Sequence, residues 1–283
     1  MLHNLNFIDI HYHVNPDSYR RRYNSIKAGK IYKDLKGMVV LKNHLGSSVA
    51  IAETAYLENL PVLGSLVLNK IAGETWKTII QQNLCMYNKD CFRLLVHLPT
   101  IVHSHHKSTL KRCTTNTYIQ KFALAPSSLL DSKFRLKQGV VEILLFAKDY
   151  PIIISTGHSN KLETMAVIEY CDKIGVNKLL LNQPANPIVG LIANDLRQFS
   201  TYKFIYFEQT ALTYLLNYQN YQDFVDVIAN IPNVIYSSDL GQTSQMDIQE
   251  WLINSHKWFR NAQLSETRIQ DITLNNPLKL LSI

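Results

Sequence analysis

The stretch Phe7–His13, with the sequence FIDIHYH, combines the β-branched and aromatic residues of a buried strand with two histidines two positions apart. Side chains alternate between the two faces of a strand, so His11 and His13 should point to the same side, together with Asp9. Two imidazoles on one side of a strand can converge on a single metal ion. The stretch therefore predicts a strand that ends at a metal site, if the rest of the chain supplies a matching fold and further ligands.

Similar apolar runs recur along the 283 residues, and segments long enough for helices separate them. The eight runs span residues 7–13, 38–44, 61–68, 93–98, 152–158, 178–183, 203–208 and 234–239. Most are almost continuously hydrophobic, which is typical of parallel strands that are covered on both faces. Eight strands alternating with helices predict an α/β fold, a distorted (β/α)8 TIM-like barrel.

The segments between the runs support this interpretation. Residues 161–175 and 221–231 have helical patterns, and Gly175 is suited to end the first of them. A long polar stretch, residues 99–133, follows the fourth strand before a helical pattern resumes over 134–148. An insertion at this end of a barrel strand commonly forms a lid or a pocket wall. We see no linker or repeat, so we expect a single domain over residues 1–283.

The composition is that of an ordinary globular protein, with 46% hydrophobic and 18% charged residues. No run approaches the roughly 18 apolar residues of a membrane-spanning helix, and the first residues lack the pattern of a secretory signal. The four cysteines form no Cys-x-x-Cys pair, which favours reduced thiols over a zinc ribbon. We therefore expect a cytoplasmic protein that does not interact with membranes.

The net charge of +7 raises the question of nucleic-acid binding. However, the basic residues are widely spread, and the densest runs, residues 20–22 and 107–112, are short. A solvated surface explains this distribution better, and attraction of an anionic small-molecule substrate is a second use of the charge. We expect no nucleic-acid partner; such binding would depend steeply on salt and would not respond to His11→Ala.

Polar residues stand at the carboxyl ends of six of the eight predicted strands. They are His11 and His13, Lys42 and His44, His158, Gln183, Glu208, and Asp239. The carboxyl ends of barrel strands form one rim, where the catalytic sites of such barrels lie. These residues are therefore predicted to converge on one site although more than two hundred positions separate the first from the last.

Four of these residues form a candidate metal shell: His11, His13, His158 and Asp239. Three imidazoles and a carboxylate suit zinc, or manganese or iron, with a position left for water. Such an ion lowers the pKa of its water towards roughly 7 and polarises a carbonyl or phosphoryl oxygen. Asp239 could bind the metal, accept a proton from the water, or do both.

The chain here resembles the amidohydrolase superfamily of metal-dependent barrel hydrolases. The resemblance is carried by Asp9, His11 and His13 on the first strand, His158 within Thr156-Gly157-His158, and Asp239 within Ser238-Asp239. Residues 38–44, 66–73, 98–100 and 155–158 look more closely like a bacterial and archaeal subgroup known only as a domain of unknown function. The resemblance covers nearly the whole chain and implies a distorted (β/α)8 barrel with one or two divalent metals.

One position departs from the superfamily pattern. Where these hydrolases usually carry a histidine on the sixth strand, this chain has Gln183, and an amide is a poor metal ligand and no base. The fourth strand, 94–98, also offers no lysine for a carboxylated bridge. We therefore expect one metal ion; the alternative is a pseudoenzyme that binds metal or ligand without turnover.

Lys42, His44 and Glu208 are predicted to serve the reaction. Lys42 and His44 would orient the substrate or stabilise its oxyanion, and a carbamylated Lys42 could bridge metals. Alternatively, Lys42 only reaches the rim and pairs with Glu208. Glu208 is accordingly either a proton shuttle or the counter-ion of Lys42.

Three further histidines, His103, His105 and His106, lie in the insertion after the fourth strand. They could form a second metal cluster, although loop histidines are more often solvated. With Lys107, Lys111 and Arg112 they could instead form a cationic lid over an acidic substrate.

The sequence thus predicts a metal-dependent hydrolase with one divalent ion, zinc before manganese or iron. The bond attacked would be an amide, lactone, cyclic imide or ester of a small substrate, for which the positive net charge favours an anion. A phosphoesterase or a decarboxylase on the same barrel is the alternative reaction. A homodimer is expected only because dimers are the commonest assemblies.

Overall fold

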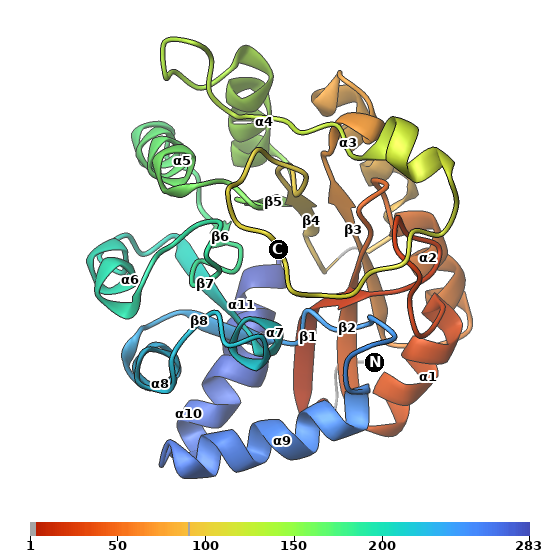
Figure 1. Ribbon diagram of the computed structural model, residues 1–283, viewed down its shortest axis with the longest axis vertical. Coiled ribbons are helices and arrows are strands. Elements are labelled where there is room, and N and C mark those ends of the chain that lie inside the picture. Colours follow the sequence, from red (N-terminus) through yellow and green to blue (C-terminus); the bar gives the residue numbers. More distant parts are fainter. Residues whose placement is uncertain (1–3, 90) are drawn as a thin grey trace.

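The computed structural model describes residues 4–89 and 91–283 of the chain. Eight parallel strands follow one another in order around a barrel, with helices outside them (Figure 1). The strands are β1 (Phe7–His13), β2 (Gly37–Lys42), β3 (Val62–Val67), β4 (Leu94–His97), β5 (Ile152–Ser155), β6 (Leu179–Leu181), β7 (Ile205–Thr210) and β8 (Val234–Ser237). This confirms the predicted (β/α)8 TIM-like barrel.

The helices alternate with these strands. The α-helices are α1 (Ser25–Asp34), α2 (Val49–Leu57), α3 (Trp76–Met86), α4 (Gln138–Asp149), α5 (Lys161–Ile174), α6 (Ala193–Phe199), α7 (Ala211–Leu215), α8 (Tyr221–Asn230), α9 (Ile248–Asn261), α10 (Glu266–Gln270) and α11 (Asn276–Leu281). Three short turns of other helix types are η1 (Lys70–Ala72), η2 (Ile119–Ala123) and η3 (Asp271–Asn275). Among the described residues, no helix is long and apolar enough to cross a bilayer.

The helix boundaries follow local signals. Helix α5 begins with a capping box between Asn160 and Glu163 and ends at Gly175, whose φ of +73° is the left-handed conformation that glycine favours. Helix α4 starts at Gln138, four residues after the predicted start at 134. The delay arises because the Asp131 carboxylate accepts the backbone N–H groups of Lys133 and Arg135 and holds these residues in a turn.

The barrel closes between β1 and the chain that follows β8. The N–H of Asp239 donates to the carbonyl of His11 at 2.9 Å, and the N–H of His13 donates to the carbonyl of Leu240 at 2.9 Å. Below them the Asp9 carboxylate accepts the N–H of Ser238 at 3.0 Å. A side chain therefore replaces part of the backbone ladder at this seam, which distorts the barrel there.

The expectation that Asp9 points to the same side of β1 as His11 and His13 was wrong. The pairing register of β1 with β2 shifts between Asp9 and Tyr12, and this irregularity breaks the alternation of side chains. The second carboxylate oxygen of Asp9 accepts the hydroxyl of Tyr32 on α1 at 2.5 Å, and burial raises the pKa of Asp9. Asp9 therefore belongs to the seam and does not line the site.

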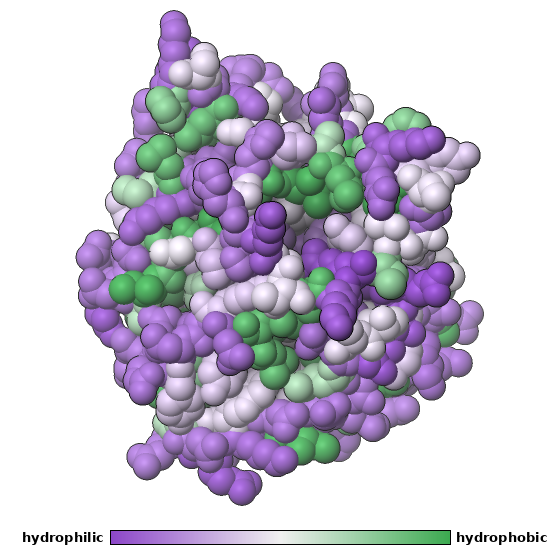
Figure 2. All heavy atoms as spheres, viewed as in Figure 1, coloured by the Kyte–Doolittle hydropathy of each residue, from purple (hydrophilic) through white to green (hydrophobic). Residues whose placement is uncertain are grey.

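The insertion after β4, residues 98–118, crosses the carboxyl end of the barrel (Figure 1). Its anchors are hydrogen bonds from the N–H of Arg20 to the carbonyl of Cys113 at 2.9 Å and from the N–H of Thr109 to the Tyr218 hydroxyl at 2.7 Å. We call this segment the lid. On the same face, hydrophobic side chains interrupt a largely hydrophilic surface (Figure 2). The predicted pocket wall is thus present.

Candidate metal centre

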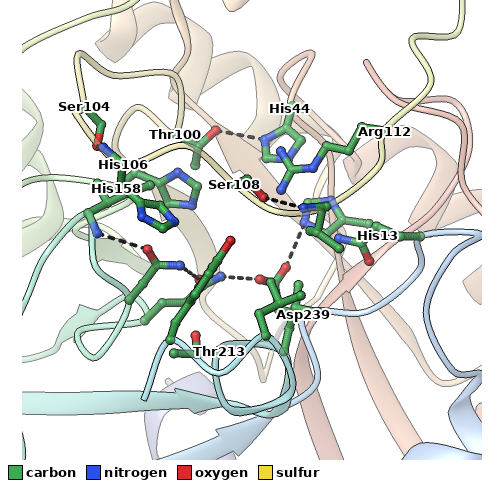
Figure 3. Close-up of a pocket in the computed structure, with 18 of the residues that line it drawn as sticks. His13, His44, Thr100, Ser104, His106, Ser108, Arg112, His158, Thr213 and Asp239 are labelled. Carbon is green, nitrogen blue, oxygen red and sulfur yellow. Dashed lines mark hydrogen bonds and ion pairs between the residues drawn. The ribbon is translucent and has the colours of Figure 1, made fainter. Parts of the chain in front are cut away.

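Three side chains converge where β1 and β8 end. The Nε2 atoms of His11 and His13 lie 3.3 Å apart, and the Oδ1 atom of Asp239 lies 3.0 Å from the first and 3.3 Å from the second. All three residues are buried. Figure 3 shows His13 and Asp239 facing each other across one end of the cavity. Three of the four predicted metal ligands therefore come together.

The backbone after β8 turns sharply to place the carboxylate. Asp239 has a φ of +52°, and Gly241 follows with a φ of +114°. A Cβ added at Gly241 would lie 2.0 Å from the carbonyl oxygen of His13, so only glycine allows the two segments to approach this closely. The strained turn thus holds Asp239 against the histidine pair.

The spacing of the three atoms fits a metal ion. Ligands at roughly 2.0–2.2 Å from a tetrahedral zinc ion lie about 3.3–3.6 Å from one another, by simple geometry. The separations here are 3.0–3.3 Å. Two imidazole nitrogens and one carboxylate oxygen are also ligand types that zinc, manganese and iron accept. The residues present therefore fit a divalent cation.

A carboxylate lies behind each of the two imidazoles. Glu208 Oε1 is 2.9 Å from His11 Nδ1, and Asp17 Oδ2 is 3.3 Å from His13 Nδ1, a buried nitrogen without an aligned hydrogen bond. Ser237 donates to the same oxygen of Glu208 at 2.8 Å. Glu208 therefore accepts the Nδ1 proton of His11 and leaves the Nε2 lone pair of that ring facing Asp239, while Asp17 places a negative charge beside His13 Nδ1.

The electrostatics favour positive charge at the three atoms. Burial would lower the pKa of His11, but Asp239 and Glu208 outweigh burial and raise it. Burial and Arg21 lower the pKa of His13. Burial opposes the ionised form of Asp239, yet His11 and His13 hold its pKa well below the usual range. Asp239 is therefore a carboxylate, and its charge attracts a proton or a cation to the cluster.

Sequence reasoning missed Asp17 and assigned Arg21 to the solvated surface, which was wrong. Both are buried, and Arg21 binds the Asp17 carboxylate through Nε at 2.8 Å and a second guanidinium nitrogen at 2.6 Å. Against the cost of burial, the Arg21 guanidinium holds the pKa of Asp17 far below its usual range. These residues lie in the irregular loop after β1, where no strand or helix period indicates which side chains turn inward.

His44 and His158 lie in the same cavity outside the three-atom cluster. The His44 ring stacks on His13 with centroids 4.7 Å apart, and its Nδ1 is 2.9 Å from the Thr100 hydroxyl. His13, Asp17 and His44 also form a second close group. His158 lines the cavity, and burial and Lys42 lower its pKa to about 3. Both imidazoles are thus neutral at pH 7, because burial also lowers the pKa of His44.

Lys42 and Glu208 do not pair directly. In the described part of the chain no ion pair within 4.0 Å joins them; the Lys42 amino group donates to the Asn182 side chain at 2.9 Å, and Glu208 pairs with His11. Lys42 is fully buried and absent from the cavity lining. Burial lowers its pKa to about 8, although Glu208 and Asp239 oppose this shift.

Gln183 joins two of the carboxylates. Its side-chain amide donates to Oδ2 of Asp239 at 2.7 Å, and its backbone N–H donates to Oε2 of Glu208 at 3.2 Å. A φ of +45° allows both contacts. The glutamine therefore orients Asp239 and leaves the carboxylate oxygen Oδ1 facing the two histidines.

The cavity above these residues has a volume of about 310 Å³ and is roofed by the lid. The lid contributes Thr100, Ile101, Val102, Ser104, His106, Ser108, Leu110 and Arg112, and Figure 3 shows several of them around the opening. His103, His105, Lys107 and Lys111 are exposed and do not line it. Of the three lid histidines only His106 faces the cavity, packed edge-on against Tyr218.

Comparisons with known proteins agree with this architecture. The model of a family of unknown function, DUF6282, matches residues 6–208. The chain matches no curated protein. Among solved structures, an amidohydrolase from Burkholderia multivorans with bound zinc is similar with a TM-score of 0.54 and 9% identity, over 97% of this chain and 98% of that one. At this identity the likeness concerns the fold alone, and it confirms the predicted (β/α)8 barrel.

Proposed function

The chain belongs to the family of unknown function DUF6282, and we propose that it is a hydrolase dependent on one divalent metal ion held by His11, His13 and Asp239. The observation that carries the proposal is the cluster of three ligand atoms 3.0–3.3 Å apart. The carboxylates of Glu208 and Asp17 behind the imidazoles support it, because second carboxylates of this kind orient metal-binding histidines. Zinc is the first choice, with manganese or iron as alternatives.

When bound, such an ion supplies an acidified water and polarises the oxygen of the scissile group. The two carboxylate oxygens of Asp239 have different roles. Oδ1 faces the histidines, and Oδ2, which accepts one hydrogen bond from Gln183, has a second lone pair that can accept the proton of the attacking water. The proton then passes to the leaving group as the bond of the amide, lactone, cyclic imide or ester breaks. His44 and His158, both neutral, can hydrogen-bond the substrate oxygens.

A single ion accounts best for the residues present. Gln183 stands where the superfamily resemblance leads one to expect a histidine, and its amide is engaged by Asp239 at 2.7 Å. Lys42 is engaged by Asn182 beneath the cavity, so it supports the site through charge. A cavity of about 310 Å³ suits a small-molecule substrate.

Metal content tests the proposal directly. The protein, purified without chelator or metal-affinity resin, would be measured by plasma mass spectrometry beside the double variant His11→Ala/His13→Ala. A matched control is His103→Ala/His105→Ala, which removes two exposed histidines outside the cavity. We expect about one equivalent of metal in the wild type and in the control, and loss of the ion in the cluster variant.

The other outcomes are equally informative. Near two equivalents would contradict the single-ion site, and no metal even after reconstitution would overturn metal dependence. Metal binding without turnover on amide, lactone, cyclic imide, ester and phosphoester substrates would favour the pseudoenzyme. In that case Gln183, which cannot act as a base, is the residue to restore to histidine.

A further inference from the structure

We propose that the substrate carries a carboxylate, and that Arg112 of the lid binds this carboxylate at the mouth of the cavity. The inference rests on the proposed function, because it names the substrate class of the same site. It places the anionic end of the substrate at the lid and the bond to be broken above His11, His13 and Asp239.

The charges that line the cavity carry the argument. Among the described residues, Asp239 is the only acidic residue in the lining and Arg112 the only lysine or arginine. Asp239 is already engaged by His11, His13 and Gln183. Throughout residues 4–89 and 91–283, no carboxylate lies within 4.0 Å of the Arg112 guanidinium. The cavity thus presents one permanent cation whose fork of donors has no acidic partner.

One ring contact and the neighbouring backbone restrain the exposed Arg112. Its guanidinium lies over the ring of Tyr19, 5.1 Å from the centroid, and Tyr19 also lines the cavity. The next residue in the chain, Cys113, accepts the N–H of Arg20 at 2.9 Å, and Thr114 pairs with Tyr19. Figure 3 shows Arg112 extending towards His44. An arginine that is ordered before binding loses less conformational freedom when it grips a ligand.

The composition of the lid region points the same way. Residues 98–130 contain four basic residues, Lys107, Lys111, Arg112 and Lys121, and no Asp or Glu. Lys107, Lys111 and Arg112 are all exposed, but the two lysines do not line the cavity, so they can attract an anion without holding it there. Of these four residues, only Arg112 lines the cavity and can bind the substrate carboxylate there.

One negative charge matches this site better than two. Among the described residues that line the cavity, Arg112 is the only lysine or arginine, so its guanidinium offers one permanent positive charge, which pairs with one carboxylate. A planar guanidinium pairs with a carboxylate through two parallel hydrogen bonds. Ile101, Val102, Leu110 and Leu216 of the same cavity favour an apolar body next to that carboxylate.

Binding of benzoate and of its neutral isostere benzamide, measured by isothermal titration calorimetry, tests the inference without turnover. Benzoate should bind at least tenfold more tightly than benzamide, and Arg112→Ala should remove this preference. Lys107→Ala is the matched control, because it removes an exposed lid cation outside the cavity. Arg112→Lys should retain only part of the preference, since it keeps the charge but loses the planar fork.

A metal ion could itself attract benzoate, so the titrations are repeated in His11→Ala/His13→Ala. If Arg112 is the anchor, the preference for benzoate persists there and still depends on Arg112, whatever becomes of the proposed hydrolase. Equal affinities for benzoate and benzamide, or an equal loss in Arg112→Ala and Lys107→Ala, would overturn the inference. Phenyl phosphate that binds more tightly than benzoate through Arg112 would overturn the assignment of a carboxylate.

Discussion

Replacing Glu208 by glutamine tests whether the carboxylate behind His11 prepares the metal site. Glu208 Oε1 accepts from His11 Nδ1 at 2.9 Å and from Ser237 at 2.8 Å, while Oε2 accepts the backbone N–H of Gln183 at 3.2 Å. An amide oxygen can replace only one carboxylate oxygen. The amide NH₂ group must then face either the N–H of Gln183 or the donors on His11 and Ser237.

The expected effect of Glu208→Gln on metal binding is large. Loss of an outer carboxylate typically weakens metal affinity about 10- to 100-fold, or about 1.4–2.7 kcal/mol. The buried charge of Lys42 also loses a stabilising neighbour, because Glu208 raises the pKa of that lysine. We therefore expect the variant to fall within this range, with the barrel still folded.

Competition with a zinc chelator of known affinity at pH 7.5 would measure the effect, and circular dichroism would confirm the fold. Glu163→Gln is a matched control, because Glu163 is also buried and accepts hydrogen bonds from Ser128 and the Leu129 N–H, but does not line the cavity. It should lower stability and leave zinc affinity unchanged. Zinc affinity in Glu208→Gln within twofold of the wild type would refute this reasoning.

Three further outcomes are expected. Asp239→Ala should lose both metal and activity while the circular dichroism spectrum stays that of a folded barrel; retained metal in a folded variant would remove Asp239 from the ligands. His158→Ala should keep its metal by mass spectrometry and lose at least tenfold in kcat, since His158 lines the cavity outside the three-atom cluster; loss of metal would restore it as a ligand. Burial lowers the pKa of Lys42 from 10.5 to about 8 in the folded protein. Between pH 8 and 10.5 the unfolded state therefore binds more protons than the folded state, and the free energy of unfolding rises with pH by up to about 3 kcal/mol. Urea unfolding at pH 8 and 10.5 should show that Lys42→Met loses this rise, and an unchanged rise would assign it to other groups.

The sequence was sufficient to locate the strands because their physics is simple. Parallel strands buried on both faces are continuous apolar runs, and all eight observed strands begin and end within two or three residues of the predicted runs. The three-atom cluster followed from the same argument, since His11 and His13 end β1 and Asp239 follows β8. A strand pattern therefore predicts both the fold and the rim of its site.

The remaining features depend on irregular backbone. The register shift in β1 turned Asp9 away from the site, and the loop after β1 turned Asp17 and Arg21 into it. The loops after β6 and β8 reach positive φ at Gln183 and Asp239, and their mutual hydrogen bond follows from that geometry. No hydrophobic period marks such turns, so the side chains that they position cannot be assigned from the sequence.

The charges around the cluster connect the metal site to the lid. Three carboxylates, Asp17, Glu208 and Asp239, surround the histidine pair, and two cations, Arg21 and Lys42, are buried with them. With neutral histidines this buried group has one negative charge in excess, which is costly to bury without a counter-ion. A proton on His11, whose pKa is raised, supplies one positive charge; a divalent ion supplies two and makes the group positive. The metal-loaded cluster below the cavity and Arg112 in the lid above it would then both attract an anionic substrate. Loading the site with metal should therefore itself strengthen the binding of benzoate.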